Sequence, residues 1–123
     1  MKIQYNREDK VLTVKMTEEI DHHFAEKIRN NVDFEIQRYL PKEVTLDFEE
    51  VKFMDSAGIG LIIGRYKTAS MYGCKINMIN VEHNVKKVLD MAGISKLLPI
   101  NEKIGGEKFE RCIWEFDETR IQK

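Results

Sequence analysis

The sequence predicts a single α/β domain in which helices pack on a mixed β-sheet that begins with an antiparallel hairpin. Three observations support this fold class. Segments that alternate apolar and polar residues take turns with segments of helical spacing, the 123 residues suit one domain with a buried core, and no linker, repeat or low-complexity run divides the chain. Because strands alternate with helices after the hairpin, we expect right-handed β–α crossovers and the order β-β-α-β-α-β-α-β-α.

The hairpin is predicted at residues 1–16. Ile3 and Tyr5 alternate with polar neighbours, residues 6–10 form a polar turn, and residues 12–16 alternate again. Strands with this pattern turn their apolar side chains to the core, so we expect the other face of the hairpin to be solvent-exposed.

A long helix is predicted next. Asp21 is a suitable N-cap, because its side chain can accept a hydrogen bond from a backbone N–H of the first turn. Pro41 ends the helix, since proline has no N–H to donate. The core-facing side chains expected at helical spacing are Phe24, Ala25, Ile28, Val32, Ile36 and Leu40.

A strand and a second helix form the central unit of the predicted domain. Residues 44–48 alternate with the period of a strand and are rich in residue types that strands favour. The apolar residues that then recur at helical spacing are Leu61, Ile62, Ala69 and the stem of Tyr66. Gly73 follows at the position where a left-handed residue commonly ends a helix.

The following elements continue the alternation. Residues 76–79 predict a strand, and residues 85–92 carry apolar side chains at helical spacing up to Gly93, which closes that helix. Residues 97–100 form at best a short edge strand, because Pro99 cannot donate a hydrogen bond to a neighbouring strand.

The C-terminal part of the chain is predicted to hold one more helix. Four apolar residues at helical spacing indicate a helix over residues 109–116. Residues 117–123 form a mostly polar tail that we expect to fray. We therefore assign residues 1–116 to the folded domain.

The turn between the central strand and its helix carries an Asp-Ser pair and two glycines, in the run Phe53-Met54-Asp55-Ser56-Ala57-Gly58-Ile59-Gly60. Ser56 is expected at or next to the helix N-cap, with its hydroxyl exposed and unpaired backbone N–H groups just beyond it. Gly58 and Gly60 remove side chains from the first turn, so another molecule could approach the backbone closely. The simplest interpretation of the serine by itself is a helix cap.

Two catalytic motifs do not fit this turn. A nucleophile elbow needs Gly-x-Ser-x-Gly, but position 54 is Met. A dinucleotide-binding loop needs Gly-x-Gly-x-x-Gly, but the third glycine comes one residue late, at Gly64, with Ile63 in its place. A small nucleotide-binding or hydrolytic domain that uses Ser56 stays an alternative, and it would need a general base near Ser56 or a site for ATP.

The run Met54-Asp55-Ser56-Ala57-Gly58-Ile59-Gly60, after the strand Leu46-Asp47-Phe48, resembles the phosphorylation-site segment of STAS domains in anti-sigma factor antagonists. The other segments that share this resemblance are Glu19-Ile20-Asp21-His22-His23-Phe24-Ala25-Glu26, Gly64-Arg65-Tyr66-Lys67 and Asp90-Met91-Ala92-Gly93-Ile94. The match extends over residues 3–100 and is most similar to the anti-sigma-F branch, from endospore-forming bacteria. The double histidine after Asp21 favours that branch over its general-stress relatives.

The resemblance implies a STAS-like fold and a regulatory function. In this family the serine at the position of Ser56 is phosphorylated by the anti-sigma factor, which is itself a protein kinase. The unphosphorylated form binds that kinase and releases the sigma factor, and a phosphatase reverses the modification. The resemblance thus implies a partner-switching phosphoprotein that controls sporulation sigma-F, is not an enzyme and needs no cofactor; an antagonist in a general-stress sigma pathway is the alternative.

The same resemblance, together with the expected position of the turn, defines a surface for the anti-sigma factor kinase. This surface consists of the Ser56 loop, the start of its helix and the region after Asp21. The residues expected to contact the partner are Asp21, His22, His23, Asp55, Ser56, Ala57, Gly58, Ile59, Gly60 and Arg65.

The polar residues of this surface have simpler alternatives. His22 and His23 would point about 100° apart on a helix, with no third ligand visible nearby, so a solvent-facing or partner-contacting role is favoured over a metal site. Asp21 and Asp55 could form an acid/base pair, but we expect one to cap a helix and both to shape the potential around Ser56.

Five further residues have simple structural interpretations. Arg65 and Lys67 are expected on a solvated helix face, with Arg65 also a candidate partner contact. Gly60 and Gly64, one turn apart, are expected to be close-packing positions. His83 is expected in a loop and is assigned no role.

Composition argues against several other classes of protein. Lys and Arg number 20 against 21 Asp and Glu, and this balance argues against a nucleic-acid-binding protein. No apolar run approaches the roughly 20 residues of a membrane span, and no secretory signal opens the chain. Cys74 and Cys112 lack metal-ligand spacing. We therefore expect a cytoplasmic protein with reduced thiols and no metal, with a monomer as the working expectation.

Overall fold

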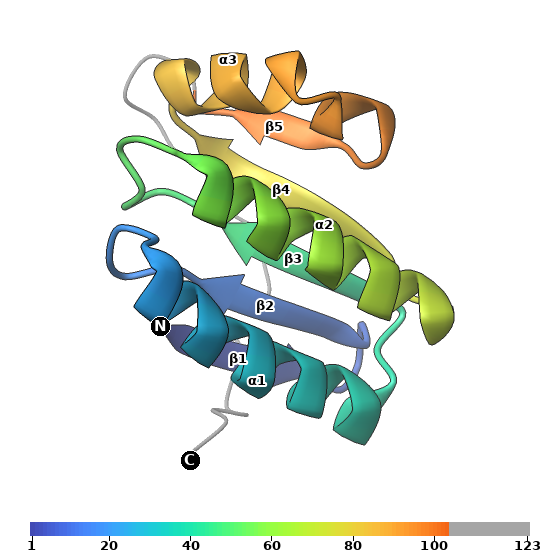
Figure 1. The fold of residues 1–123 in the computed structure, drawn as a ribbon. Helices are drawn as coiled ribbons and strands as arrows, with labels where there is room; N and C mark the ends of the chain where they lie inside the picture. The colour runs from blue at the N-terminus through green and yellow to red at the C-terminus, as the bar shows by residue number, and fades with distance from the viewer. Residues whose placement is uncertain (104–123) are drawn as a thin grey trace.

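The structure is a computed structural model that describes residues 1–103 (Figure 1). The predicted alternation of strands and helices is confirmed over this part of the chain. The elements are β1 (Lys2–Asn6), β2 (Val11–Lys15), α1 (His22–Tyr39), β3 (Glu43–Asp47), α2 (Ser56–Met71), β4 (Lys75–Val81), α3 (His83–Met91), a short 3₁₀ helix η1 (Ile94–Lys96) and β5 (Ile100–Glu102). The helix predicted over residues 109–116 and the tail at 117–123 lie outside the described residues.

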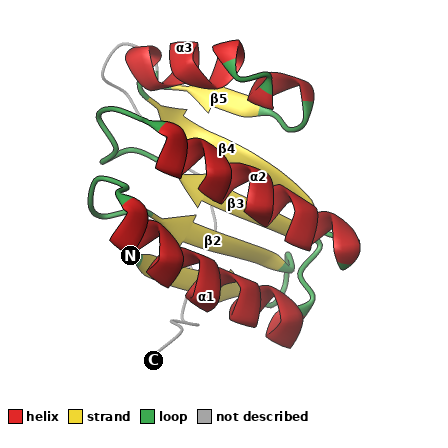
Figure 2. Cartoon of the chain, in the orientation of Figure 1, coloured by secondary structure: helices red, strands yellow, loops and turns green. Residues whose placement is uncertain are grey.

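The described strands form one mixed sheet in the order β1-β2-β3-β4-β5. β1 and β2 form the predicted antiparallel hairpin, and every other neighbouring pair is parallel. Helices α1, α2 and α3 cover one face of this sheet (Figure 1, Figure 2). Because β2 and β3 are parallel neighbours, α1 and α2 begin side by side at the carboxyl edge of the sheet, where binding sites of such sheets gather.

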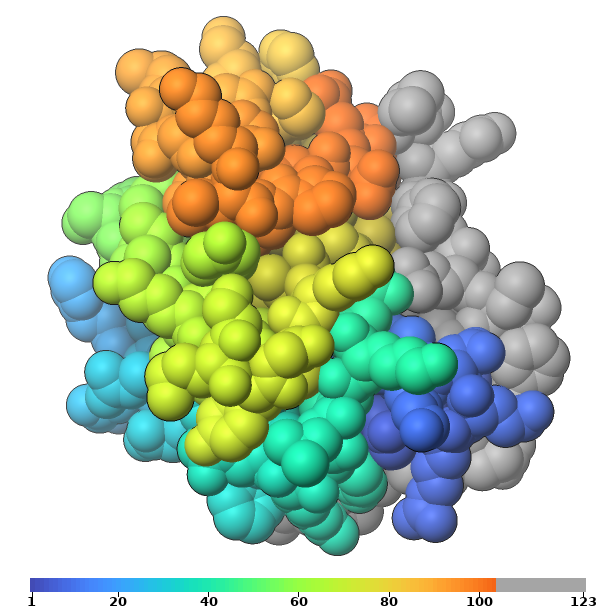
Figure 3. Space-filling model, turned by 90° about the vertical axis from the view of Figure 1, so that its right-hand side faces the viewer, coloured from blue at the N-terminus to red at the C-terminus, as the bar shows by residue number. Residues whose placement is uncertain are grey.

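The opposite edge of the sheet is viewed in Figure 3. The C-terminal end of α2 and the connection from α1 to β3 lie on this side, below α3, η1 and β5 (Figure 3). The amino ends of α1 and α2, together with the turn that precedes α2, lie at the other end of the two helices (Figure 1).

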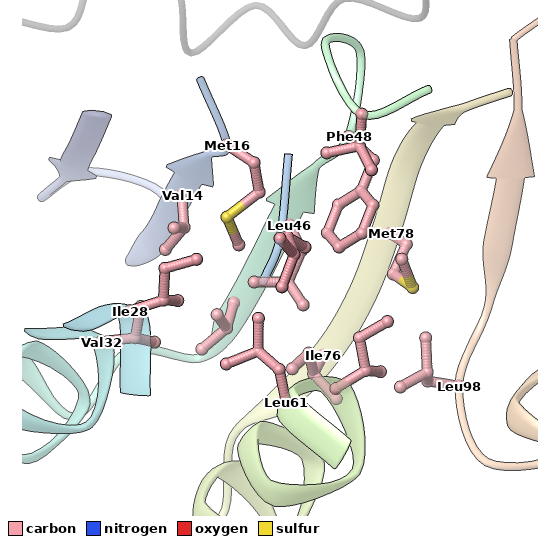
Figure 4. Close-up of a cluster of buried hydrophobic side chains, with 14 of the residues drawn as sticks. Val14, Met16, Ile28, Val32, Leu46, Phe48, Leu61, Ile76, Met78 and Leu98 are labelled. Atoms are coloured by element: carbon pink, nitrogen blue, oxygen red, sulfur yellow. The ribbon is translucent and has the colours of Figure 1, made fainter. Parts of the chain in front are cut away.

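The hydrophobic core lies between the sheet and its helices (Figure 4). Apolar side chains from one face of each strand meet the apolar stripes of α1 and α2, which is why alternation in the strands and helical spacing in the helices predicted the elements. The labelled core residues in this view are Val14, Met16, Leu46, Phe48, Ile76 and Met78 on the sheet side, Ile28 and Val32 from α1, Leu61 from α2, and Leu98.

The second face of the sheet differs from the expectation. We expected one face of the hairpin to be solvent-exposed, but Gln4 and Thr13 are buried and lie opposite each other in the register of β1 and β2. The row continues through Thr45 and Asn77, which are buried as well. The alternation of apolar and polar residues predicts which face of a strand packs on the core. It does not predict whether the polar side chains on the other face are buried.

The ends of the helices follow the predicted signals. Asp21 is the N-cap of α1, and Gly73 and Gly93 follow α2 and α3 in left-handed conformations, with φ of 74° and 79°. Leu40, predicted on the core face, is instead an exposed left-handed C-cap residue of α1, because the helix ends at Tyr39, two residues before Pro41. Among the described residues, none of the helices is both long and apolar enough to span a membrane.

Two assignments near the end of the described chain are corrected. The edge strand predicted at residues 97–100 begins only at Ile100, after Pro99. Pro99 has no N–H, and it contributes its carbonyl, which accepts a hydrogen bond from the Met78 N–H at 3.0 Å. His83 is the first residue of α3 rather than a loop residue, and its Nδ1 lies 3.1 Å from a carboxylate oxygen of Glu102.

Candidate functional site

Two helix N-termini lie together at the carboxyl edge of the sheet, as expected. Asp21 caps α1, with Oδ1 accepting a hydrogen bond from the Phe24 N–H at 2.8 Å. Asp55 caps α2 in the same way, with Oδ1 accepting from the Ala57 N–H at 3.0 Å. Both aspartates therefore act as caps, and each has a carboxylate oxygen committed to the backbone, which makes an acid/base pair a poor description of them.

Ser56 is the first residue of α2 and is exposed. Because Asp55 is the residue that caps the helix, the Ser56 hydroxyl is not needed for capping. It stands at the positive end of the helix dipole. The expectation of unpaired N–H groups just beyond it is wrong, because Asp55 accepts from the N–H groups of residues 57–59 through its side chain and its carbonyl. A hydroxyl in this position is accessible to a second molecule.

A groove of about 560 Å³ runs between α1 and α2 from the Ser56 end. The residues that line it are His22, Ala25, Glu26 and Arg29 from α1, and Ser56, Ala57, Gly60, Leu61, Gly64 and Arg65 from α2. Of the two predicted histidines, both exposed in the first turn of α1, only His22 is among these residues. The groove thus brings together side chains from both segments that the sequence singled out.

The glycines of α2 have different roles. A Cβ at Gly60 or Gly64 would meet no atom within 4 Å, so the expectation that these are close-packing positions is wrong. Their lack of side chains keeps the groove open instead. Gly58 is the packing position: a Cβ there would lie 1.8 Å from the sulfur of Met54. Gly58 is buried by this contact, so it gives space to Met54 rather than to another molecule.

Arg65 is buried, although we expected it on a solvated face; only 4% of it is exposed. Its Nε lies 2.8 Å from Oδ1 of Asp33, and its Nη2 donates to Oδ2 of the same carboxylate at 3.1 Å. Burial lowers the pKa of Arg65, and the Asp33 carboxylate opposes that shift. The two-pronged pair ties α2 to α1 at one end of the groove. Lys67 is exposed, as predicted.

The loop before Ser56 is held by groups that the sequence did not indicate. The Lys52 N–H donates to the carboxylate of Glu19 at 3.1 Å, and the Lys52 carbonyl accepts from the side-chain amide of Asn84 at 2.6 Å. Glu19 precedes α1 and Asn84 lies in the first turn of α3, so the loop is tied to its neighbours on both sides. No local pattern reports such contacts, because the partners are 33 and 32 residues away.

Comparison with known proteins connects this geometry to a family. The family model of the STAS domain matches residues 2–106. The anti-sigma F factor antagonist of Paenibacillus polymyxa is 35% identical over 100 residues, which cover 81% of this chain and 86% of that protein. The anti-sigma-B factor antagonist of Staphylococcus aureus is 22% identical over 102 residues, which cover 83% of this chain and 94% of that protein.

Solved structures share the fold. The anti-sigma factor antagonist SpoIIAA in its unphosphorylated form matches with a TM-score of 0.70 at 23% identity, over 86% of this chain and 91% of that one. The phosphorylated form of the Bacillus protein SpoIIAA matches with a TM-score of 0.64 at 22% identity, over 86% and 95% of the two chains. The predicted fold class is therefore confirmed, and the chain belongs to the STAS-domain family of anti-sigma factor antagonists.

Proposed function

We propose that this protein releases a sigma factor by binding its anti-sigma factor, and that phosphorylation of Ser56 by that anti-sigma factor, acting as a serine kinase, ends the binding. The observation that carries the proposal is the Ser56 hydroxyl, exposed as the first residue of α2 and lining the groove between α1 and α2. Asp55 caps the helix, so this hydroxyl is free to serve a partner.

The groove supplies the contact surface in this proposal. His22, Glu26 and Arg29 give it a charged and polar wall on α1, while Gly60 and Gly64 leave the α2 side open to close approach. A kinase that phosphorylates Ser56 must bring its ATP to this end of the groove. Binding and modification therefore use the same surface, which couples the two events.

The proposed switch acts by local charge. A phosphate adds about −1.5 to −2 charges at neutral pH. In the free protein the dipole of α2 favours this charge by about 0.3–1 kcal/mol, and the nearby carboxylate of Asp55 opposes it. In the bound state an enclosed phosphate without matched donors costs several kcal/mol, which exceeds the dipole gain. Phosphorylation should therefore weaken binding without unfolding the domain.

The identities to the relatives support one choice of pathway for this proposal. The Paenibacillus relative, named for the anti-sigma F factor, is 35% identical, whereas the Staphylococcus antagonist of the anti-sigma-B factor is 22% identical. This difference favours control of the sporulation factor sigma-F over a general-stress pathway. A serine phosphatase would return the protein to its binding form, and the cycle would run in the cytoplasm, where sigma factors act.

The test is incubation of the protein with ATP and the purified anti-sigma F factor from the same genome, followed by peptide mapping. We expect one phosphate, located on Ser56, and none on a Ser56→Ala variant. A phosphate on Ser70 or Thr45 would remove the basis of the proposal. A parallel titration with ATP alone and a hydrolase screen test the other class of function, since a nucleotide-binding or hydrolytic domain would give a signal without the partner.

A further inference from the structure

We propose that Phe53 is an aromatic anchor for the anti-sigma factor, at the edge of the Ser56 surface. This inference rests on the proposed function and adds a residue that the expected contact set lacks. Phe53 is 59% exposed, although aromatic side chains of this size usually bury most of their surface. It lies three residues before the hydroxyl that the kinase has to reach.

The exposure of Phe53 is specific within its loop. The other large apolar side chains between β3 and α2 point inward: Phe48, Val51 and Met54 are all buried. In Figure 1 this loop extends past the carboxyl end of β3, beside the loop that precedes α1. Among the large apolar residues of this loop, Phe53 is therefore the one that is exposed to solvent, at the edge of the Ser56 surface.

The residues on both sides of Phe53 are fixed. The preceding residue, Lys52, has its N–H bound by Glu19 and its carbonyl bound by Asn84. The following residue, Met54, places its sulfur in the space left by Gly58. An exposed side chain on a frayed loop would lose much entropy on binding, whereas a side chain on a loop held at both ends loses little. The geometry thus presents the ring in a preorganised way.

The chemistry of the ring indicates what it would contact. Aromatic residues are enriched among the few side chains that dominate interfaces, where they fill apolar pockets of the partner. The anti-sigma factor must approach this corner to phosphorylate Ser56, so its surface passes over Phe53. We expect an apolar pocket on the kinase next to its phosphate-transfer site. Because the ring is uncharged, its contribution should persist when the charge at Ser56 changes.

The test is calorimetric titration of the purified anti-sigma F factor from the same genome with the wild-type chain and with Phe53→Ala. We expect Phe53→Ala to weaken binding by roughly tenfold to thirtyfold. The matched control is Phe34→Ala, because Phe34 is also exposed, at 56%, but lies in the C-terminal half of α1, away from the helix N-termini that form the Ser56 surface. It should change the affinity by less than twofold. Phe53→Leu serves as a second variant that keeps an apolar side chain, with a smaller expected loss.

Kinase kinetics give a second readout. Phe53→Ala should raise the KM for phosphorylation of Ser56 and leave kcat near the wild-type value, because the ring contacts the partner and does not touch the reacting atoms. Each variant is also melted, since a lost fold would lower affinity for a different reason. If the wild-type chain binds the anti-sigma factor and Phe53→Ala binds it equally well, the proposed anchor role of Phe53 is wrong while the proposed function stands. The same conclusion holds if Phe34→Ala lowers the affinity as much as Phe53→Ala. If the wild-type chain does not bind, the proposed function itself is wrong.

Discussion

Arg65 on α2 and Asp33 on α1 form a two-pronged ion pair, with Nε 2.8 Å from Oδ1 and Nη2 3.1 Å from Oδ2. The pair crosses the interface between the two helices whose N-termini form the candidate site. It therefore connects the stability of the helix pair to the shape of the groove. The two partners differ in exposure, since the Arg65 side chain is 5% exposed and the Asp33 side chain 24% exposed.

This difference predicts unequal effects of the two single substitutions. Asp33→Asn leaves a buried guanidinium without its counter-charge, so we expect it to cost about 3 kcal/mol of unfolding free energy, at the low end for a broken buried pair. Arg65→Met leaves a carboxylate that water can reach and keeps an apolar stem, so its cost should be clearly smaller. Urea unfolding of both variants measures the difference. Equal costs would contradict the claim that burial of Arg65 sets the penalty.

We expect substitutions at Gly60 and Gly58 to have opposite effects on the stability of the domain. A Cβ at Gly60 would meet no neighbouring atom within 4 Å, and Gly60→Gln replaces a glycine inside a helix, so we expect this variant to raise stability by about 0.5–1 kcal/mol. Its longer side chain should weaken binding of the anti-sigma factor by filling the groove. Gly58→Ala gains a similar helix propensity, but its Cβ would lie 1.8 Å from the sulfur of the buried Met54 side chain and displace it, so we expect a net loss of about 1–2 kcal/mol. Thermal melting beside a binding titration checks both. A lower melting temperature for Gly60→Gln with unchanged affinity would show that the groove is not the contact surface.

Phosphorylation of Ser56 is expected to lower the affinity for the anti-sigma factor by roughly a hundredfold or more, because each 1.4 kcal/mol of lost binding energy is about tenfold. Ser56→Asp should reproduce part of this loss, and Ser56→Ala should bind without being switched off. The measurements are calorimetry on the modified protein, its melting curve and its backbone amide spectrum. Unchanged affinity would disprove the switch, and a collapsed spectrum would disprove its local character.

We expect ionisation of Asp47 to contribute to the pH dependence of the stability of the domain. Burial raises the pKa of this carboxyl, although hydrogen bonds from the Glu49 N–H and the Asn80 amide oppose the shift. The folded state therefore holds the proton more tightly than the unfolded state, whose pKa is about 3.9. The stabilising contribution of Asp47 to the free energy of unfolding is fully present below the unfolded pKa. It is lost as the pH rises through the higher pKa of the folded state.

Comparison of wild type with Asp47→Asn isolates this contribution, since the amide oxygen can still accept both hydrogen bonds. The stability of the variant relative to wild type should increase as the pH rises from about 4 toward neutral. Asp90→Asn is the control of opposite sign: a hydrogen bond from Lys86 lowers the pKa of Asp90, so its stabilising contribution is lost as the pH falls. Urea unfolding from neutral pH to below about pH 4, where the contribution of Asp90 is lost, provides both curves. A flat difference for Asp47→Asn would contradict the assignment.

Much of the candidate site was predictable from the sequence because its signals are local. Asp21 and Asp55 each accept a hydrogen bond from a backbone N–H within three residues, so a suitable residue before a helical pattern is enough to predict a cap. The position of Ser56 at the start of α2 follows from the same pattern. The crossover rule then brings the starts of α1 and α2 to one edge of the sheet.

What the sequence by itself determined was the order of the elements, their caps, the class of fold and the position of Ser56, because these depend on spacings of a few residues. Tertiary structure alone decided that Arg65 is buried against Asp33. It also decided that Gly60 borders the open groove, whereas Gly58 packs against Met54. The contact of Glu19 with the loop that carries Phe53 was likewise decided only by the tertiary structure. The physical reason is distance along the chain. Arg65 and Asp33 are 32 residues apart, and Lys52 and Glu19 are 33 apart, so their contacts exist only once the helices have packed on the sheet.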